Sequence, residues 1–214
     1  SYTRRNGLPS DNVRVIFIAS DNTIWLATDD GVCYLSGDKF FTLDLGDYYK
    51  DVVIRSICEA FGGDIRLGTE KGIVAIDNKT KKLDKEEMGQ QDLNEGFIDS
   101  NVRTMLKVDD KIWIGTDSGL FIWEKGKNVP YELQSQLTDY RILELFKDSK
   151  NNLWVGTQTG INKIENGQVL KWGVQDGLVS GRVRSIVEDR YGNMWFGTSR
   201  GISIFDGYEF INIT

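Results

Sequence analysis

The sequence predicts an all-β protein built from five copies of one small antiparallel unit, and three observations support this prediction. An apolar segment with Thr near its centre recurs five times, beginning at residues 24, 65, 112, 153 and 194. Short runs of alternating apolar residues, which are typical of strands, accompany each copy. Gly and Asn interrupt the chain about every dozen residues, which excludes a helical repeat. Four short strands in about 41 residues are typical of one β-propeller blade.

The last copy shows the four expected strands most clearly. They are "VRSIVED", which begins at Val183, then "MWFGTS", "ISIF" and "YEFINI". The turn sequences "RYGN", "RG" and "DG" connect them, and a two-residue connection that ends in Gly favours a tight hairpin. This copy therefore has the pattern of one complete four-stranded antiparallel blade.

The other copies fit the same template, so the whole chain is expected to be a single propeller segment. The expected blades cover residues 13–48, 53–92, 101–135, 141–173 and 182–213. A polar stretch at 81–97 lengthens the second interval and is interpreted as an insertion in the outer strand and the following loop. Residues 2–15 align without gaps with 172–185, so residues 1–5 are expected to be an outer-strand fragment of a preceding blade. We therefore expect part of a longer array, although five blades also fit a closed ring.

The recurring segment is interpreted as architecture and not as a phosphate-binding loop, because no Lys-Ser/Thr pair and no helix follow its glycine. Arg66 stands at one position where the other copies have Trp, and the side chains at this position are expected to pack between blades. The four tryptophans are Trp25, Trp113, Trp154 and Trp195. The expected hairpin glycines are Gly31, Gly72, Gly119, Gly160 and Gly201. The threonines expected to tie the adjoining turns are Thr28, Thr69, Thr116, Thr157 and Thr198.

Composition excludes several classes of function. The net charge of −6 lacks the electrostatic footprint of a nucleic-acid binder. No apolar run is as long as a membrane span, and no secretory signal opens the chain. Cys33 and Cys58 are expected to be free core thiols. The absence of His removes Ser-His-Asp and Cys-His sites and most zinc sites. We therefore expect no catalytic residues, metal or cofactor, and a carboxylate-based hydrolase has little support.

A row of arginines is the first candidate ligand site. The residue after the first apolar position of each expected innermost strand is Arg in four blades, while blade four has Leu143 there. Because such strands begin near the central channel, the guanidinium groups can converge and bind carboxylate or sulfate. The favoured alternative is ion pairing with loop acids or hydrogen bonding to loop carbonyls, and acids such as Asp11, Asp51, Asp99 and Asp176 are the expected partners. The candidate arginines are Arg14, Arg55, Arg103 and Arg184.

Aromatic residues near the loops that join outer to inner strands are the second candidates, because sugars stack on such rings. Tyr48 and Tyr140 are the two that we single out as ligand-binding residues. Packing between blades is the alternative for every member of the group, and it is favoured for the last of them. The group comprises Tyr2, Tyr48, Tyr49, Tyr140 and Trp172.

The blade pattern closely resembles the two-component regulator propeller repeat. The residues that carry the resemblance are "DGLVSGRVRSIVEDRYGNMWFGTSRGISIFDG" at 176–207, and all five copies retain the core of the pattern. The resemblance implies a periplasmic sensor region of a hybrid two-component receptor, in which the parent protein spans the inner membrane and carries a histidine kinase. Many such regions respond to polysaccharide fragments. Streptogramin lyases also resemble these propellers, but their chemistry depends on a histidine, which this chain lacks.

Three functions therefore remain open from the sequence. The resemblance favours a carbohydrate-sensing segment, for which an oligosaccharide is the expected ligand and the membrane is reached only through the parent protein. A protein–protein interaction scaffold is the alternative, and a carbohydrate-active enzyme is the least supported. We also expect self-association through open blade ends or dimerisation of the parent receptor. Open ends are expected because an unclosed array would leave apolar faces in water.

Overall fold

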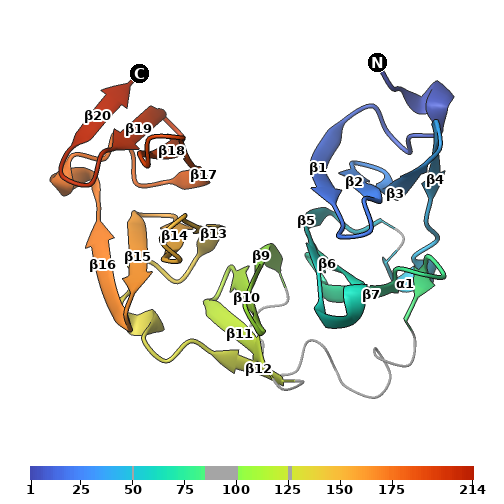
Figure 1. The fold of residues 1–214 in the computed structure, drawn as a ribbon, viewed down its shortest axis with the longest axis horizontal. Helices are drawn as coiled ribbons and strands as arrows, with labels where there is room; N and C mark the ends of the chain where they lie inside the picture. Colours follow the sequence, from blue (N-terminus) through green and yellow to red (C-terminus); the bar gives the residue numbers. More distant parts are fainter. Residues whose placement is uncertain (50, 85–100, 125–126) are drawn as a thin grey trace.

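The protein consists of five four-stranded antiparallel sheets, and within each sheet the strands follow sequence order (Figure 1). The computed structural model describes residues 1–49, 51–84, 101–124 and 127–214. Each sheet corresponds to one copy of the repeat, so the predicted all-β propeller with four-stranded blades is confirmed. A single-turn helix, α1 (Gly46–Tyr49), is the only α-helix among the described residues.

The strands of the first three blades begin and end as follows. The first blade contains β1 (Val13–Ile18), β2 (Ile24–Thr28), β3 (Gly31–Ser36) and β4 (Lys39–Thr42). The second contains β5 (Ile54–Glu59), β6 (Ile65–Thr69), β7 (Gly72–Asp77) and β8 (Lys82–Leu83). The third contains β9 (Val102–Val108), β10 (Lys111–Thr116), β11 (Leu120–Glu124) and β12 (Lys127–Pro130).

The last two blades and the short helical turns complete the chain. The fourth blade contains β13 (Ile142–Lys147), β14 (Leu153–Thr157), β15 (Ile161–Glu165) and β16 (Gln168–Trp172). The fifth contains β17 (Val183–Glu188), β18 (Met194–Thr198), β19 (Gly201–Phe205) and β20 (Phe210–Ile213). Four 3-10 turns lie at Arg4–Asn6, Phe61–Gly63, Gln134–Gln136 and Val174–Asp176.

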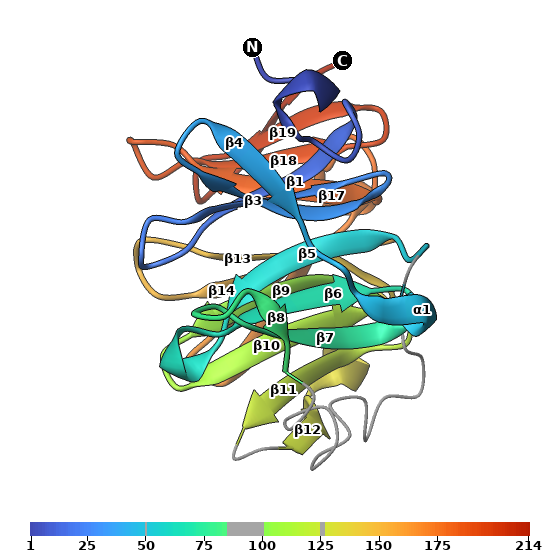
Figure 2. The same cartoon turned by 90° about the vertical axis from the view of Figure 1, so that its right-hand side faces the viewer.

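The blades follow one another around an open arc. The innermost strands β1, β5, β9, β13 and β17 each pack against the next one in this order. No comparable contact joins β17 to β1 in the described part of the chain. The first and fifth blades therefore lie on either side of an opening, near which both termini end (Figure 1). Figure 2 views the arc from the side of the first two blades, with β1 to β4 above β5 to β8.

The core lies between the blades, where the repeated tryptophan position contributes. Trp25 is fully buried in a cluster that also contains Ile54 and Ile65 of the second blade. Trp154 packs in the same way against Phe196 of the fifth blade, with the ring centroids 5.5 Å apart. Arg66, which replaces Trp, is 5% exposed and lies among apolar residues of the third blade. Burial of these faces stabilises the array because apolar area leaves water.

The Thr of each copy and the Gly that precedes it in four of the five copies have a mechanical role, as expected. In all five blades the Thr hydroxyl donates a hydrogen bond of 2.8–3.1 Å to the carbonyl of the hairpin glycine three residues later. The glycine before Thr permits close packing of the next blade. A Cβ atom on Gly115 would lie only 2.5 Å from Cγ2 of Ile142, which belongs to the following blade. A larger residue here would force adjacent blades apart.

The N-terminal segment and the stretch at 81–97 were both expected to depart from the regular blade pattern. Residues 1–5 belong to none of the five sheets, and Arg4–Asn6 is a 3-10 turn. The alignment with the later segment still holds, since Val174–Asp176 forms the same turn after β16 ends at Trp172. Most of the expected insertion at 81–97 lies outside the described residues. Cys33 and Cys58 are free and buried, as expected.

Candidate functional site

The four arginines of the expected row line one hollow of about 250 Å³ at the start of the innermost strands. Because each arginine follows the first residue of its strand, the propeller geometry brings together side chains that are up to 170 residues apart. Leu143 and Glu144 of the fourth blade complete much of the lining. The hollow therefore gathers charged groups from all five blades.

Three of these arginines interact with polar groups beside the hairpins and not with the acids expected from the sequence. Arg14 pairs with Asp29, and Arg103 pairs with Asp117. Each of these acids follows the repeated Thr of the same blade, and the strand register places that Thr opposite the residue before Arg. In the second blade the acid is Glu70, which lies 3.9 Å from Arg55.

The four expected acids do not pair with the arginine row. Asp11 accepts the backbone N–H of Arg4 at 2.7 Å, and Asp176 accepts that of Gly173 at 2.8 Å. Asp51 makes no ion pair with the row among the described residues, and Asp99 lies outside them. The expected partners were wrong because the carboxylates nearest to the arginines come from the adjacent strand of the same blade and not from the preceding loop.

Asp29 and Asp117 have pKa values below the usual range, so both remain ionised. The hydrogen bond from Asn12 is the largest cause that lowers the pKa of Asp29, and Arg14 adds to it. Partial burial raises the pKa of Asp117, but hydrogen bonds and charge from Arg103 and its neighbours more than offset this and lower the pKa below its usual range. Arginine and carboxylate charges thus largely cancel in the first three blades.

This charge balance changes in the last two blades. Gln158 and Ser199 stand where the earlier blades have an acid after the repeated Thr. Arg184 is exposed and makes no ion pair among the described residues. Glu144 is half-buried, and burial raises the pKa of its carboxyl to about 7. The fourth and fifth blades therefore contribute an uncompensated guanidinium group and a carboxyl group that titrates near neutrality.

The aromatic candidates do not gather at this hollow. Tyr140 is 53% exposed and does not belong to its lining. Tyr48 lies in α1, but its side chain is outside the described structure. Tyr49 is buried in the core between the first two blades. Trp172 stacks on Trp154 with the centroids 5.7 Å apart, and Tyr2 contacts Phe40 edge-on at 5.3 Å.

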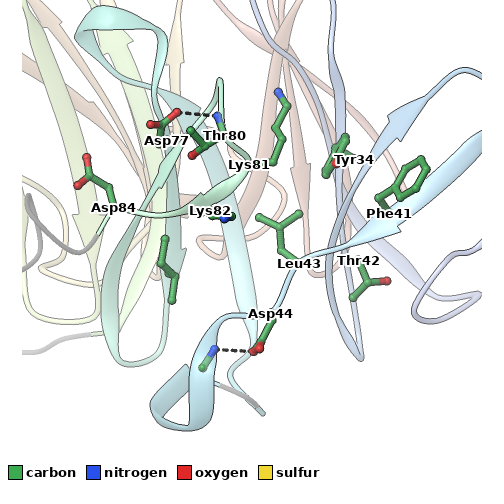
Figure 3. A pocket seen from close by; sticks show the side chains of 12 residues that line it. Tyr34, Phe41, Thr42, Leu43, Asp44, Asp77, Thr80, Lys81, Lys82 and Asp84 are labelled. Atoms are coloured by element: carbon green, nitrogen blue, oxygen red, sulfur yellow. Dashed lines mark hydrogen bonds between the residues drawn. The ribbon is translucent and has the colours of Figure 1, made fainter.

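A second hollow, which the sequence did not reveal, lies between the first and second blades (Figure 3). Its volume is about 1030 Å³, at the upper end of the range for small-molecule sites. Tyr34 and Phe41 form one side of it, and Asp77 and Lys82 lie across from them. We call this hollow the lateral groove, and its lining is Tyr34, Phe41, Thr42, Leu43, Asp44, Gly46, Asp77, Thr80, Lys81, Lys82, Leu83 and Asp84.

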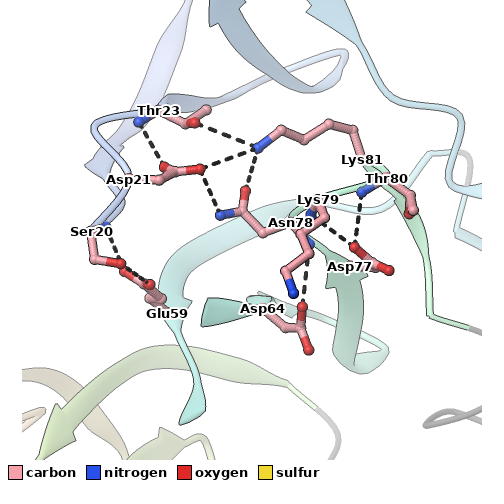
Figure 4. Close-up of polar contacts among 10 residues, drawn as sticks. All are labelled: Ser20, Asp21, Thr23, Glu59, Asp64, Asp77, Asn78, Lys79, Thr80 and Lys81. Atoms are coloured by element: carbon pink, nitrogen blue, oxygen red, sulfur yellow. Dashed lines mark hydrogen bonds and ion pairs between the residues drawn. The ribbon is translucent and has the colours of Figure 1, made fainter. Parts of the chain in front are cut away.

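A polar network joins the two blades beside the lateral groove (Figure 4). Asp21 accepts the Asn78 side-chain amide at 3.1 Å and lies 3.8 Å from the Lys81 ammonium group. That ammonium group also lies 5.0 Å from the Trp25 ring and 5.4 Å from the Tyr34 ring, which allows cation–π contacts. Burial lowers the pKa of Lys81, and Asp21 opposes this change. The network holds the aromatic side of the groove against the second blade.

Comparisons with known proteins agree with this fold. The family model described as "Two component regulator propeller" matches residues 7–30, 136–159 and 177–200. The molecule is thus a repeat protein of the β-propeller class. Three segments of the chain thus match the two-component regulator propeller repeat, as the resemblance implied. A comparison with curated protein sequences gives no match.

Several solved structures share the fold. An extracellular domain of the hybrid two component system BT3049 from B. thetaiotaomicron has a TM-score of 0.81 and 23% identity, over 95% of this chain and 29% of that one. The extracellular domain of BT4673 from the same organism, in the structure described as a hybrid two component system, has a TM-score of 0.53 and 20% identity, over 99% of this chain and 36% of that one. Virginiamycin B lyase from Staphylococcus aureus has a TM-score of 0.71 and 15% identity, over 96% of this chain and 71% of that one. The chain thus spans about a third of the two-component domains that it matches.

No helix among the described residues has the length and apolar character that crossing a membrane requires. No group of three or more Cys, Asp or Glu side chains is placed in this part of the chain to hold a metal ion.

Proposed function

We propose that this chain is a ligand-sensing segment in the periplasmic region of a hybrid two-component receptor, and that it responds to carbohydrate fragments. The repeat supports this assignment, together with the fold shared with extracellular domains of such systems. In this proposal the parent protein carries the histidine kinase and the membrane anchor, and the chain itself performs no chemistry. The receptor's signal then begins with ligand binding to the propeller.

The arginine hollow is the observation that carries the proposal. It provides a polar site where five blades meet, so a ligand there contacts groups from distant parts of the chain. Arg184 has no carboxylate partner in the described part of the chain, so it can bind a carboxylate or sulfate group bidentately. Glu144 lies in the same hollow with a raised pKa, so it can remain protonated and donate to a sugar oxygen near neutral pH. Tyr140 and Tyr48 remain proposed contacts from the neighbouring loops.

Titration calorimetry with a panel of neutral, uronic-acid-containing and sulfated oligosaccharides tests this function. We expect at least one oligosaccharide to bind. If its acidic group occupies the hollow, Arg184→Gln weakens binding about tenfold, since a charge-assisted bidentate contact is lost. Arg200→Gln is the control, because Arg200 is exposed and does not line the hollow. Failure of the whole panel to bind would contradict the sensing proposal.

A second role, association with another copy of the chain, is favoured by the two uncovered blade faces. Ile16 and Ile18 of the first blade are 66% and 62% exposed, and Val187 and Ile211 of the fifth are 55% and 58% exposed. The repeat equivalent of Ile16 is Ile186, which is 7% exposed where the fourth and fifth blades pack. The exposed faces of the first and fifth blades therefore correspond to the two surfaces that pack together between consecutive blades. We propose that they pair head to tail between copies.

Light scattering on single and mixed variants tests this pairing. Ile16→Glu and Val187→Glu each remove one end face without touching the buried core, so each variant alone is expected to be monomeric. Their mixture retains one intact face of each kind and is expected to form a one-to-one dimer, because the contact is heterologous. A wild-type chain that stays monomeric at every concentration, or a mixture that fails to pair, would rule out this role.

A further inference from the structure

The lateral groove has a close counterpart between the fourth and fifth blades, where the chain fills it with its own side chains. The residues of the two junctions correspond at a constant offset of 129 positions. At the later junction Trp172 stacks on Trp154, and Phe205 lies 5.2 Å from the Trp172 ring centre. The remaining space there is about 170 Å³, compared with about 1030 Å³ in the lateral groove.

Substitution of these aromatic residues opens the groove. Leu43 stands in place of Trp172, and Ile76 stands in place of Phe205. In addition, β8 contains two residues where its counterpart β20 contains four. Protein interiors are filled by closely packed side chains. The smaller side chains of Leu43 and Ile76 and the shorter strand β8 therefore leave the lateral groove open.

New aromatic residues appear on the wall of the opened groove. Tyr34 and Phe41 occupy the positions of Lys163 and Leu170 in the fourth blade. Their rings stack with centroids 5.7 Å apart and planes 23° apart, and the Phe41 ring is 48% exposed. The Tyr34 ring is held from behind by Trp25 at 5.6 Å. The result is a fixed aromatic surface that faces the groove (Figure 3), of the kind that binds flat apolar faces of ligands.

Two carboxylates also line the groove, Asp77 across from this surface and Asp44 at the lower edge in Figure 3. Asp44 uses Oδ1 to accept the backbone N–H of Gly46 at 2.8 Å, and Asp77 uses Oδ1 for those of Lys79 and Thr80 at 2.8 and 2.9 Å. The Oδ2 atom of Asp44 accepts no hydrogen bond in the described structure. The Asp77 carboxylate, which the Thr80 side chain also approaches, keeps further acceptor capacity because each carboxylate oxygen has more than one lone pair. The backbone N–H of Thr80 is the largest cause that lowers the pKa of Asp77, so its carboxylate remains an acceptor.

We propose that the lateral groove binds a neutral oligosaccharide, whose sugar ring stacks on Phe41 and Tyr34 and whose hydroxyl groups donate to Asp44 and Asp77. A pyranose ring has one apolar face and a rim of hydroxyl donors, which matches an aromatic wall opposite carboxylates. The lining disfavours an acidic sugar, because it contains three carboxylates, Asp44, Asp77 and Asp84, but only two lysines, Lys81 and Lys82. The Lys81 ammonium group is also already engaged with Asp21 and Asn78. This inference rests on the proposed carbohydrate-sensing function and assigns it a second, distinct site.

The repeat offers matched controls for the aromatic wall. Phe41→Ser removes the exposed ring, and we expect it to weaken binding of the preferred neutral tetrasaccharide at least about tenfold. Phe41→Trp keeps a ring and is expected to retain binding. Leu170→Ser makes the same kind of change at the equivalent position of the fourth blade, which is 41% exposed, and is expected to leave binding unchanged.

The carboxylate side has its own matched pair. Asp77→Asn keeps a shape that accepts the turn N–H groups but removes the charge, and we expect severalfold weaker binding. Asp206→Asn is the control, because Asp206 holds the equivalent turn of the fifth blade through Tyr208 and Glu209 at 2.8 and 2.9 Å. Thermal unfolding of all variants shows whether any loss of binding reflects loss of fold.

Titration calorimetry uses neutral tetrasaccharides of glucan, mannan, xylan and galactan beside uronic-acid-containing and sulfated oligosaccharides. Binding of a neutral member that falls with Phe41→Ser and Asp77→Asn, but not with the controls, supports the groove. If the affinity is unchanged by Phe41→Ser and Asp77→Asn but falls with Arg184→Gln, the groove is not the binding site, whereas the sensing function is retained. If acidic oligosaccharides bind more tightly than neutral ones and this binding falls with Phe41→Ser, the proposed neutral ligand is wrong. No binding by the wild-type protein would overturn both proposals.

Discussion

The junction between the fourth and fifth blades and the junction between the first and second blades share a backbone but differ in what lies inside it. Asn151 and Asn22 occupy the same turn position with φ of 67° and 65°. The turns are linked to the next blade in the same way, because Ser149 binds Glu188 and Ser20 binds Glu59 through a backbone N–H and a hydroxyl. The interior contacts of the two junctions, in contrast, are different.

The clearest difference is the support of the repeated tryptophan. In the fourth blade Asp148 is buried and accepts Trp154 Nε1–H at 2.8 Å, together with the side-chain amide and the backbone N–H of Asn152. In the first blade Ala19 replaces this acid, and Trp25 Nε1 is buried without an acceptor in the described structure. The turn therefore forms without the acid, and the first junction relies instead on the Lys81 network. A blade can thus lose one polar contact and keep its backbone.

Removal of the acid from the well-supported junction should have the largest effect on stability. Asp148→Ala leaves the donors of Trp154 and Asn152 buried without an acceptor, so we expect the free energy of unfolding to fall by about 2–3 kcal/mol. Urea denaturation followed by tryptophan fluorescence measures this change. A loss below about 0.5 kcal/mol would mean that the two junctions are equally well supported.

The reverse substitution tests the same comparison at the first junction. Ala19→Asp supplies an acceptor for the buried Trp25 Nε1–H, and we expect it to stabilise the chain by about 1 kcal/mol. Ala19→Asn is the uncharged control, since it adds an acceptor without a buried charge. If both variants are destabilised, the Lys81 network already compensates for the missing acid and no room remains for a larger side chain.

The equivalent acid of the fifth blade, Asp189, predicts that the stability of the fold depends on pH. Burial raises the pKa of Asp189, but hydrogen bonds from Asn193 and Trp195 outweigh this and bring it to about 2. A folded-state pKa below the unfolded value near 3.9 stabilises the fold at higher pH, and this contribution is lost as the pH falls from about 4 to about 2. We expect the stability difference between wild type and Asp189→Asn to disappear over this range, whereas a constant difference in urea titrations would contradict the assigned pKa.

The shared link between blades should give the smallest effects. Glu59→Gln and Glu188→Gln keep one acceptor each at partly exposed positions, so we expect losses of about 0.5 kcal/mol that are equal within error. Measuring both in parallel by urea denaturation isolates what the two junctions have in common. Unequal losses would show that the link, and not only the tryptophan support, distinguishes them.

The sequence predicted the architecture well, because the period and the Gly-Thr contacts are local properties of each blade. It also grouped the arginines correctly, since equivalent strand positions of a propeller face the same channel. Their partners were missed because the pairing of Arg14 with Asp29 depends on strand register. The lateral groove was missed because its volume depends on which residues fill it. A comparison of Leu43 with Trp172 across the repeats contained that signal.

In the described structure the contacts between strands of different blades join only blades that follow one another along the chain, which makes the molecule a one-dimensional chain of coupled units. Every strand pair joins sequence neighbours, so folding can begin in any blade and propagate without the closure of long loops. Unfolding should begin at the two end blades, each of which has a single neighbour. Amide protons of β13 and β14 should consequently exchange more slowly with solvent than those of β19 and β20, and chemical denaturation should proceed by successive loss of blades.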